Sequence, residues 1–358
     1  MPSIQPGFPL GRMEISCTFV EYQNHFDMAD LSVNYLGLKL RNPIIVGSSG
    51  LTEKLETMRN LEQNGAGALV LKSLFEEEIV LEKKARLSRM RSGGELYPES
   101  LEFYQYEEAP RESTATYLEN LQNVKKQVQI PLLASINCMT SEQWTWFPKE
   151  IEDAGADALE LNLFILPSDL DRDAEENKKI YFDIIAAVTD KVKIPVSLKI
   201  SYYFSDLAAM IKKLSETGIR GLVLFNRFYS PDFDLDTFEI TSGSVLSSPG
   251  DLSLSLRWIA LMAERVDCDL AASTGVHDGE ALIKQLLAGA CAVQIVSTIY
   301  KNGGERIGEM LHDLEAWMNK HGFKNIQDFR GRLSQAKSEH PAAYERVQFM
   351  KYFRGFQG

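Results

Sequence analysis

The sequence predicts an α/β protein of the TIM (β/α)8 barrel class, with long loops over the C-terminal face of the barrel. Short apolar runs alternate with helical stretches along the 358 residues. The runs are apolar enough to be buried on both faces, as the strands of a parallel sheet are. A doubly wound open sheet is the alternative, but the GxGxxG that such a sheet usually carries after its first strand is absent here.

Eight strands are expected, several of them preceded by a Gly-Ala or Ile-Pro turn. They cover residues 43–49, 68–73, 131–137, 158–163, 195–200, 221–226, 269–274 and 292–297. Helical stretches such as DLAAMIKKLSETG and GEALIKQLLAG lie between them. Their apolar residues are three and four apart, and each stretch ends at a glycine, as helices often do.

Two insertions interrupt the alternation, at about residues 76–129 and 228–255. Long loops at the C-terminal ends of barrel strands usually cover an active site. We expect residues 1–27 to be a flexible N-terminal extension and residues 28–334 to form the barrel. Residues 335–358 are expected to form a helical tail packed on the barrel.

The composition disfavours several classes of protein. The formal net charge of -12 argues against nucleic-acid binding, because an acidic surface repels phosphate backbones. No apolar run approaches the roughly 20 residues that span a bilayer, and the first residues lack the apolar stretch of a secretory signal. The four cysteines show no CxxC spacing. Neither a disulfide framework nor a metal site is therefore expected, which suits a cytoplasmic protein.

Polar residues stand at the C-terminal ends of the expected strands, where barrel enzymes keep their chemistry. Among them are two lysines and three asparagines, and buried charges are costly unless they have partners. This pattern predicts a planar polar ligand, with amides as hydrogen-bonding groups and ammonium groups facing carbonyl oxygens or developing negative charge. The candidates are Ser48, Ser49, Gly50, Lys72, Ser73, Asn137, Asn162, Lys199, Asn226 and Arg227.

Two turns after the seventh and eighth expected strands predict a phosphate site. Thr274, Gly275 and Val276 precede one helix, and Ser297 and Thr298 precede another apolar turn. Barrels often bind phosphate at these places through backbone N–H groups. Ordinary capping is the alternative, because Ser and Thr favour helix N-caps.

These motifs, in this order, resemble the dihydroorotate dehydrogenase family from about residue 30 to residue 333. The resemblance is carried by the turn at 48–50, the Lys72-Ser73 pair, ELN at 160–162, STGVHDG at 273–279 and VSTIYKNG at 296–303. It implies an FMN-dependent oxidoreductase of pyrimidine biosynthesis. Such an enzyme oxidises dihydroorotate to orotate or acts on the CH–CH bond of a related dihydropyrimidine-like ring. The same analogy implies a homodimer, while the electron acceptor is not identified.

The resemblance also implies a role for each motif. The turns at 48–50, 274–276 and 297–298 would hold FMN, together with Ser73 and Asn137. Lys72 would face the flavin ring and the substrate, and Asn162 would reach both. Lys199 would meet a nitrogen and an oxygen of the reduced flavin ring. Asn226, with Arg227 beside it, would lie on the substrate side.

The loop that carries the catalytic base departs from the family pattern. The family usually has N-L-S-C-P-N, or a serine variant, and its cysteine or serine takes a proton from the substrate. Here Ile165 occupies that position, and Pro167 replaces the second asparagine. We predict Ser168, in the same loop, as the base, with helix capping as its alternative role. The other candidates are Asp169, Cys138 and Tyr104.

The substrate-binding half of the motif set is altered as well. The family's N-S-M-G loop is missing between the second and third strands, and Thr274 stands where the family commonly has glycine. Two other functions therefore stay open. One is a flavin-binding protein without dehydrogenase turnover, which the missing base favours. The other is a barrel enzyme that acts on a phosphate substrate without flavin, which a colourless purified protein would favour.

Overall fold

Eight parallel strands close into a barrel in the computed structural model, which describes residues 29–80, 114–141, 144–163, 165–227 and 230–345. Each strand pairs with the next around the barrel, and the last pairs with the first, which confirms the predicted TIM barrel. In that order they are β3 (Ile44–Val46), β4 (Ala68–Val70), β6 (Leu132–Cys138), β7 (Ala158–Leu163), β8 (Val196–Ile200), β9 (Gly221–Leu224), β12 (Asp269–Ser273) and β13 (Ala292–Ile295). All eight overlap the ranges expected from the sequence.

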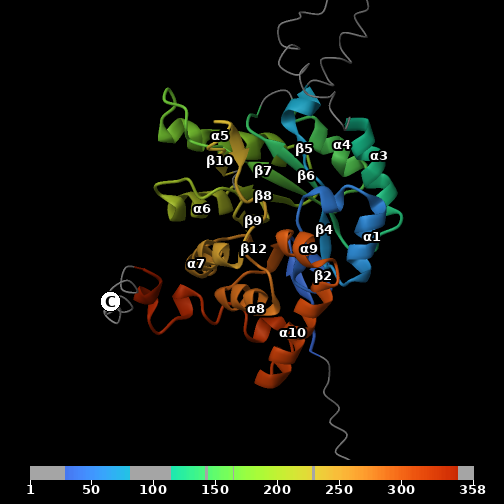
Figure 1. The fold of residues 1–358 in the computed structure, drawn as a ribbon, viewed down its shortest axis with the longest axis vertical. Coiled ribbons are helices and arrows are strands. Elements are labelled where there is room, and N and C mark those ends of the chain that lie inside the picture. The colour runs from blue at the N-terminus through green and yellow to red at the C-terminus, as the bar shows by residue number, and fades with distance from the viewer. Residues whose placement is uncertain (1–28, 81–113, 142–143, 164, 228–229, 346–358) are drawn as a thin grey trace, which may run out of the picture.

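Helices surround the barrel (Figure 1) and connect successive strands. Gly218 and Gly289 follow two of them with φ angles of 87° and 121°, a backbone conformation that only glycine adopts at little cost. The glycine stops expected for these two helices are therefore present. The helices are α1 (Leu55–Gln63), α3 (Thr114–Lys125), α4 (Phe147–Asp153), α5 (Ala174–Thr189), α6 (Leu207–Ser215), α7 (Leu252–Met262), α8 (Gly279–Ala288), α9 (Ser297–Asn302) and α10 (Arg306–His321).

A short hairpin closes the N-terminal end of the barrel. It consists of β1 (Val33–Tyr35) and β2 (Leu38–Leu40), and the backbone N–H of Leu36 at its turn donates to Oδ2 of Asp269 at 2.7 Å. Gly221 starts β9 directly beneath this turn, where a Cβ atom would lie 2.5 Å from the Leu36 side chain. Because the hairpin fills this end, the opposite, C-terminal end is left for a functional site.

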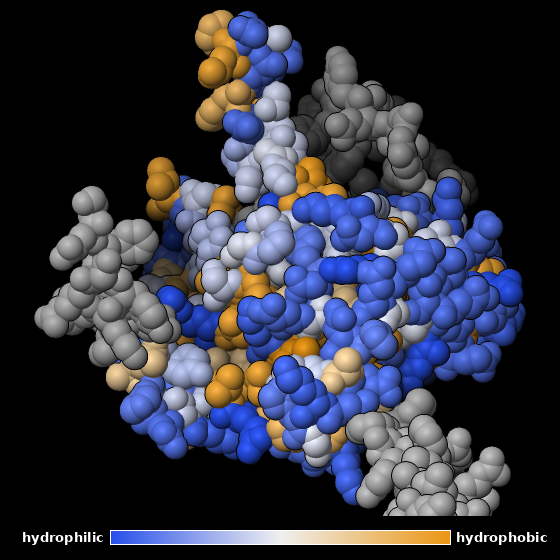
Figure 2. Space-filling view, turned by 60° about the horizontal axis from the view of Figure 1, so that its bottom comes forward, coloured by the Kyte–Doolittle hydropathy of each residue, from blue (hydrophilic) through white to orange (hydrophobic). Residues whose placement is uncertain are grey.

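The two insertions differ in how much of them the structure describes. The first contains β5 (Leu74–Phe75), which extends strand β4 along β6, and then residues 81–113, which lie outside the described residues. The second forms the antiparallel hairpin of β10 (Pro231–Phe233) and β11 (Ile240–Ser242). In Figure 2 this hairpin projects as an arm, and its exposed apolar side chains are Phe233, Leu235, Phe238 and Ile240.

The ends of the chain are described only in part. Residues 1–28 and 346–358 lie outside the described residues, so the flexible extension and most of the expected tail helix stay predictions. The start of the tail, η5 (Gln335–Lys337), contacts the end of α7, where Arg265 donates to Oε1 of Gln335 at 2.6 Å. Within the described part of the chain, every helix is too short or too polar to cross a bilayer.

Candidate active site

A cavity of about 470 Å³ opens at the C-terminal ends of the barrel strands. This volume lies in the range of ordinary ligand and cofactor pockets, about 300–1,000 Å³. Most of the predicted site residues line it, and residues 245–247 of the second insertion cover one side. The predicted residues in the lining are Ser48, Ser49, Asn162, Lys199, Asn226, Arg227, Thr274, Gly275, Val276 and Ser297.

The other predicted residues lie outside this lining, and some of them support it. Oγ of Ser73 lies 2.9 Å from Oγ of Ser48 and 2.7 Å from Oγ of Ser135, so it ties the first turn to the neighbouring strands. The ammonium of Lys72 pairs with Glu53 at 3.1 Å. Thr298 donates from Oγ1 to the carbonyl of His277 at 3.0 Å, which joins the two turns that were predicted to bind phosphate.

Strand register places the predicted amides and one lysine at the same level of the barrel. Asn137, Asn162 and Lys199 are successive partners across β6, β7 and β8. Parallel neighbours in register point their side chains to the same face. Asn226, at the end of β9, donates from its side-chain amide to Oδ1 of Asn162. The polar side chains of these four residues therefore form one group.

Lys199 also belongs to a buried polar network inside the barrel. Its Nζ donates to Oε1 of Gln294 at 2.9 Å, and Nε2 of Gln294 donates to Oε2 of Glu160 at 2.5 Å. Burial lowers the pKa of Lys199, and the charge of Glu160 opposes that shift. Glu160 belongs to the ELN motif, but neither Glu160 nor Gln294 is among the residues predicted for the site. The sequence signal for Glu160 is two-residue alternation, which puts it on the same face as Asn162.

The turn after β12 has an unusual backbone that exposes hydrogen-bond donors. Thr274 and Gly275 have φ angles of 77° and 81°, in the left-handed region that favours glycine. This explains why the related family commonly has glycine at position 274, and here Oγ1 of Thr274 donates to the carbonyl of Phe225 at 3.2 Å. Among the described residues, the N–H groups of Val276 and Ser297 meet no acceptor, and both residues line the cavity.

The second insertion contributes a residue that was not predicted, Ser247. Its N–H donates to Oγ of Ser297 at 2.9 Å, and its hydroxyl lies 3.1 Å from Nε2 of His277. The ammonium of Lys301 donates to the Ser247 carbonyl at 2.7 Å. Burial lowers the pKa of His277, and the charge of Lys301 lowers it further. At this end the cavity is therefore lined by hydroxyl and N–H groups next to the Lys301 cation.

The loop after β7 does not bring a base into the cavity lining. Ile165 is buried and apolar, whereas Ser168 is exposed and lies outside the lining. Ser168 as the catalytic base stays a prediction, but its alternative role as a helix cap is wrong. Helix α5 begins at Ala174, and its N-cap is Asp173, five residues after Ser168; the Asp173 carboxylate accepts from the backbone N–H groups of Glu175 and Glu176.

The other candidate bases are not better placed. Asp169 forms an exposed ion pair with Arg172 at 2.8 Å, and its pKa is lowered, first by a hydrogen bond from the backbone of Asp171. Burial raises the pKa of the Cys138 thiol well above its usual range, so it is not a thiolate at neutral pH. Tyr104 lies outside the described residues.

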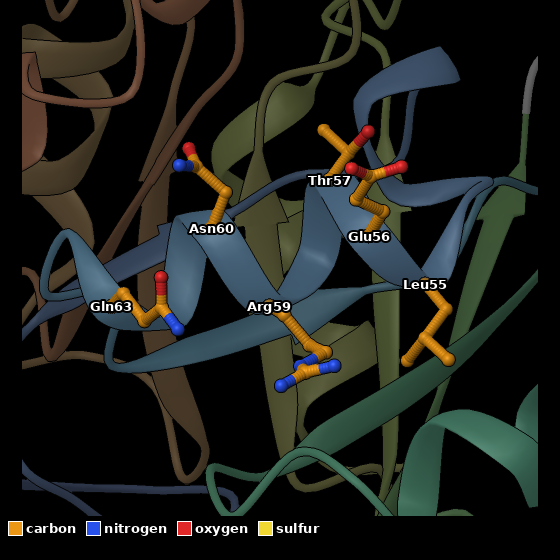
Figure 3. Close-up of a pocket in the computed structure, with 6 residues that line it drawn as sticks. All are labelled: Leu55, Glu56, Thr57, Arg59, Asn60 and Gln63. Atoms are coloured by element: carbon orange, nitrogen blue, oxygen red, sulfur yellow. The ribbon is translucent and has the colours of Figure 1, made fainter.

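Other places on the described surface bring together fewer groups that could bind or react with a ligand. A larger hollow of about 770 Å³ runs along α1 (Figure 3), but all of its lining side chains come from that one helix and none from a strand end. The part of the chain described here also lacks any group of three His, Cys, Asp or Glu side chains placed to bind a metal ion. The cavity at the barrel mouth is therefore the candidate active site.

Comparisons with known proteins show the family to which the chain belongs. The family model for dihydroorotate dehydrogenase matches residues 30–318. The catalytic subunit of dihydroorotate dehydrogenase B (NAD(+)) from Thermoplasma volcanium is 26% identical over 320 residues, which cover 85% of this chain and 98% of that protein. Its counterpart from Pyrococcus abyssi is 25% identical over 312 residues, 84% of this chain and 98% of that protein. The chloroplastic dihydropyrimidine dehydrogenase (NADP(+)) of Arabidopsis thaliana is 23% identical over 337 residues, 87% of this chain and 78% of that protein.

Proposed function

Because the chain belongs to the dihydroorotate dehydrogenase family and is an oxidoreductase of that type, we propose that it binds FMN and acts on the CH–CH bond of a dihydropyrimidine-like ring. One observation carries this proposal. Buried Lys199 lines the same cavity as Val276 and Ser297, whose N–H groups meet no acceptor in the described part of the chain. A single cavity thus offers a cation for a flavin ring and backbone donors for a phosphate.

The residues fit FMN at both ends of the cavity. The N–H groups of Val276 and Ser297 would bind the phosphate, and the Lys301 cation nearby favours a charged group there. Asn162 and Lys199 would contact the ring, and Ser48 and Ser49, which line the same cavity, would also help to hold it. Binding would be non-covalent, since the donors are amide, hydroxyl and ammonium groups.

We assign a separate role in the reaction to each of the side chains in the cavity. Bound FMN would supply the hydride acceptor or donor. The Lys199 ammonium stabilises negative charge that develops beside it, and such stabilisation is strongest in a site shielded from water. Asn162 and Asn226 orient the substrate through their amides. Ile165 cannot accept a proton, so we assign no proton transfer to the position that carries the base in the family.

Arg227 favours a substrate that carries a negative charge. Its guanidinium donates to the carbonyl of Val245, and among the described residues it has no carboxylate within ion-pair distance. It lines both the main cavity and an adjoining cavity of about 410 Å³. The stacked rings of Tyr202 and Tyr203, 4.7 Å apart, form a wall of that second cavity. A planar ring with a carboxylate, such as dihydroorotate, matches this combination.

Anaerobic stopped-flow reduction of the bound flavin tests the proposal. Dihydroorotate should bleach the flavin faster than dihydrouracil, which lacks the carboxylate. Both rates should be low, because a missing general base typically costs about 10²–10⁴-fold. Arg227→Gln should abolish the preference while FMN content is unchanged. Equal rates for both compounds in the wild-type protein would overturn the charge assignment, and bleaching by neither would favour a flavin protein without dehydrogenase turnover.

A further inference from the structure

A polar network crosses the interior of the barrel directly below the candidate site. It joins Glu160 on β7, Gln294 on β13 and Lys199 on β8. Strands β7 and β13 are four places apart in either direction around the barrel, so they face each other across its axis. The Gln294 side chain therefore spans the barrel interior and connects two opposite walls.

The chemistry of the two ends fixes the orientation of the Gln294 amide. Nε2 can only donate, and it lies 2.5 Å from a carboxylate oxygen. Oε1 can only accept, and it lies 2.9 Å from an ammonium nitrogen. A flipped amide would set donor against donor and acceptor against acceptor. Hydrogen bonds to charged groups are the strong ones, so the amide is held at both ends.

The network leaves the ammonium available to the cavity. Glu160 is fully buried, and Gln294 and Lys199 are 2% and 8% exposed. Gln294 stands between the two charges, so one donor of the ammonium is used within the barrel, and the other two have no acceptor among the described residues. Oε1 of Glu160 is buried and has no hydrogen-bond partner among the described residues. The Glu160 carboxylate therefore has no other hydrogen-bond donor among the described residues, and its negative charge acts on the Lys199 ammonium through Gln294.

We propose that Gln294 is a positioning residue that holds the Lys199 ammonium at the floor of the cavity and couples it to Glu160. Without the amide, the ammonium is free to turn toward the carboxylate and away from the cavity. The proposed consequence is stronger stabilisation of the negatively charged, reduced ligand than of the oxidised one. This inference rests on the proposed function, since the ligand it names is FMN.

The midpoint potential of bound FMN, measured on the purified holoenzyme, tests the coupling. Gln294→Met keeps the size of the side chain and removes the amide. We expect about tenfold less stabilisation of the reduced flavin, which is a potential about 30 mV more negative for two electrons. The matched control is Gln285→Met, because Gln285 is also fully buried but lies on α8 outside the cavity lining. Its potential should equal that of the wild type.

A double-mutant cycle separates positioning from a general structural effect. If Gln294 acts through Lys199, the potential of the Gln294→Met/Lys199→Met protein should equal that of Lys199→Met alone. Additive shifts would overturn the proposal. So would an unchanged potential in Gln294→Met, or an equal shift in the Gln285→Met control.

A second measurement does not depend on flavin. Crystal structures of the wild type and of Gln294→Met should show the Lys199 ammonium displaced toward Glu160 in the variant. An unmoved ammonium would overturn the inference. If the purified protein carries no FMN, the proposed function fails, and the crystal structures still decide whether Gln294 positions Lys199.

Discussion

Replacing Lys199 by alanine should separate the stabilisation of developing charge from the binding of the cofactor. The residue is 8% exposed, and its ammonium donates one hydrogen bond to Gln294 at 2.9 Å. Removing a preorganised donor that faces developing negative charge typically costs about 10²–10³-fold in rate, or about 2.7–4 kcal/mol. The oxidised ring is neutral, so its hydrogen bond to the Lys199 ammonium lies at the low end of those that involve a charged group, about 1.5 kcal/mol. FMN binding should therefore weaken by about tenfold.

Two assays on the same preparations measure these effects. Anaerobic stopped-flow absorbance follows flavin reduction, and fluorescence titration of the apoprotein gives the affinity for FMN. Lys125→Ala is the matched control, because Lys125 is part-exposed, is already paired with Asp157 at 2.7 Å, and lies on α3 outside the cavity lining. Its reduction rate should fall by less than about tenfold. Reduction of Lys199→Ala at the wild-type rate would refute the role given to this ammonium.

Three further predictions concern the turns and the base loop. Gly275→Ala should destabilise the protein by more than about 1 kcal/mol in urea unfolding, because φ is 81° and the new Cβ would lie 2.1 Å from the backbone nitrogen of Leu252; an unchanged midpoint would refute this packing. Burial lowers the pKa of His277 below its ordinary value of 6.5, so the unfolded chain takes up the proton first and stability should fall as the pH drops below about 6.5. His277→Gln should reduce that slope in thermal unfolding, and an equal slope would contradict the shift. If Ser168 is the base, Ser168→Ala should slow flavin reduction by about 10²-fold or more; an unchanged rate, in keeping with its exposed place outside the lining, would rule it out as the base.

The barrel and the position of its site could be predicted because both follow from local patterns. Strands buried on both faces are continuous apolar runs, so a polar residue such as Asn162 or Lys199 at the end of such a run stands out. Parallel strands bring these ends to one face of the barrel. The structure accordingly places Asn162 and Lys199 in register and on one cavity.

Features that depend on barrel closure could not be predicted in the same way. Gln294 contacts Glu160 only because β13 faces β7 across the axis, and no local spacing relates the two residues. Ser247 reaches Ser297 from a long insertion whose path is set by tertiary packing. The cap of α5 was placed too early, at Ser168, because PSDLDRDAEE offers several capping residues and only Asp173 reaches the helix N–H groups.

The absorption spectrum of the purified protein tests most directly whether this cavity holds FMN. The protein should show the two visible bands of an oxidised flavin, and denaturation should release FMN in an amount close to one per chain. Supplying free FMN during purification controls for loss of the cofactor. A colourless protein that takes up no FMN, or one that releases FAD instead, would show that the cavity is not an FMN site.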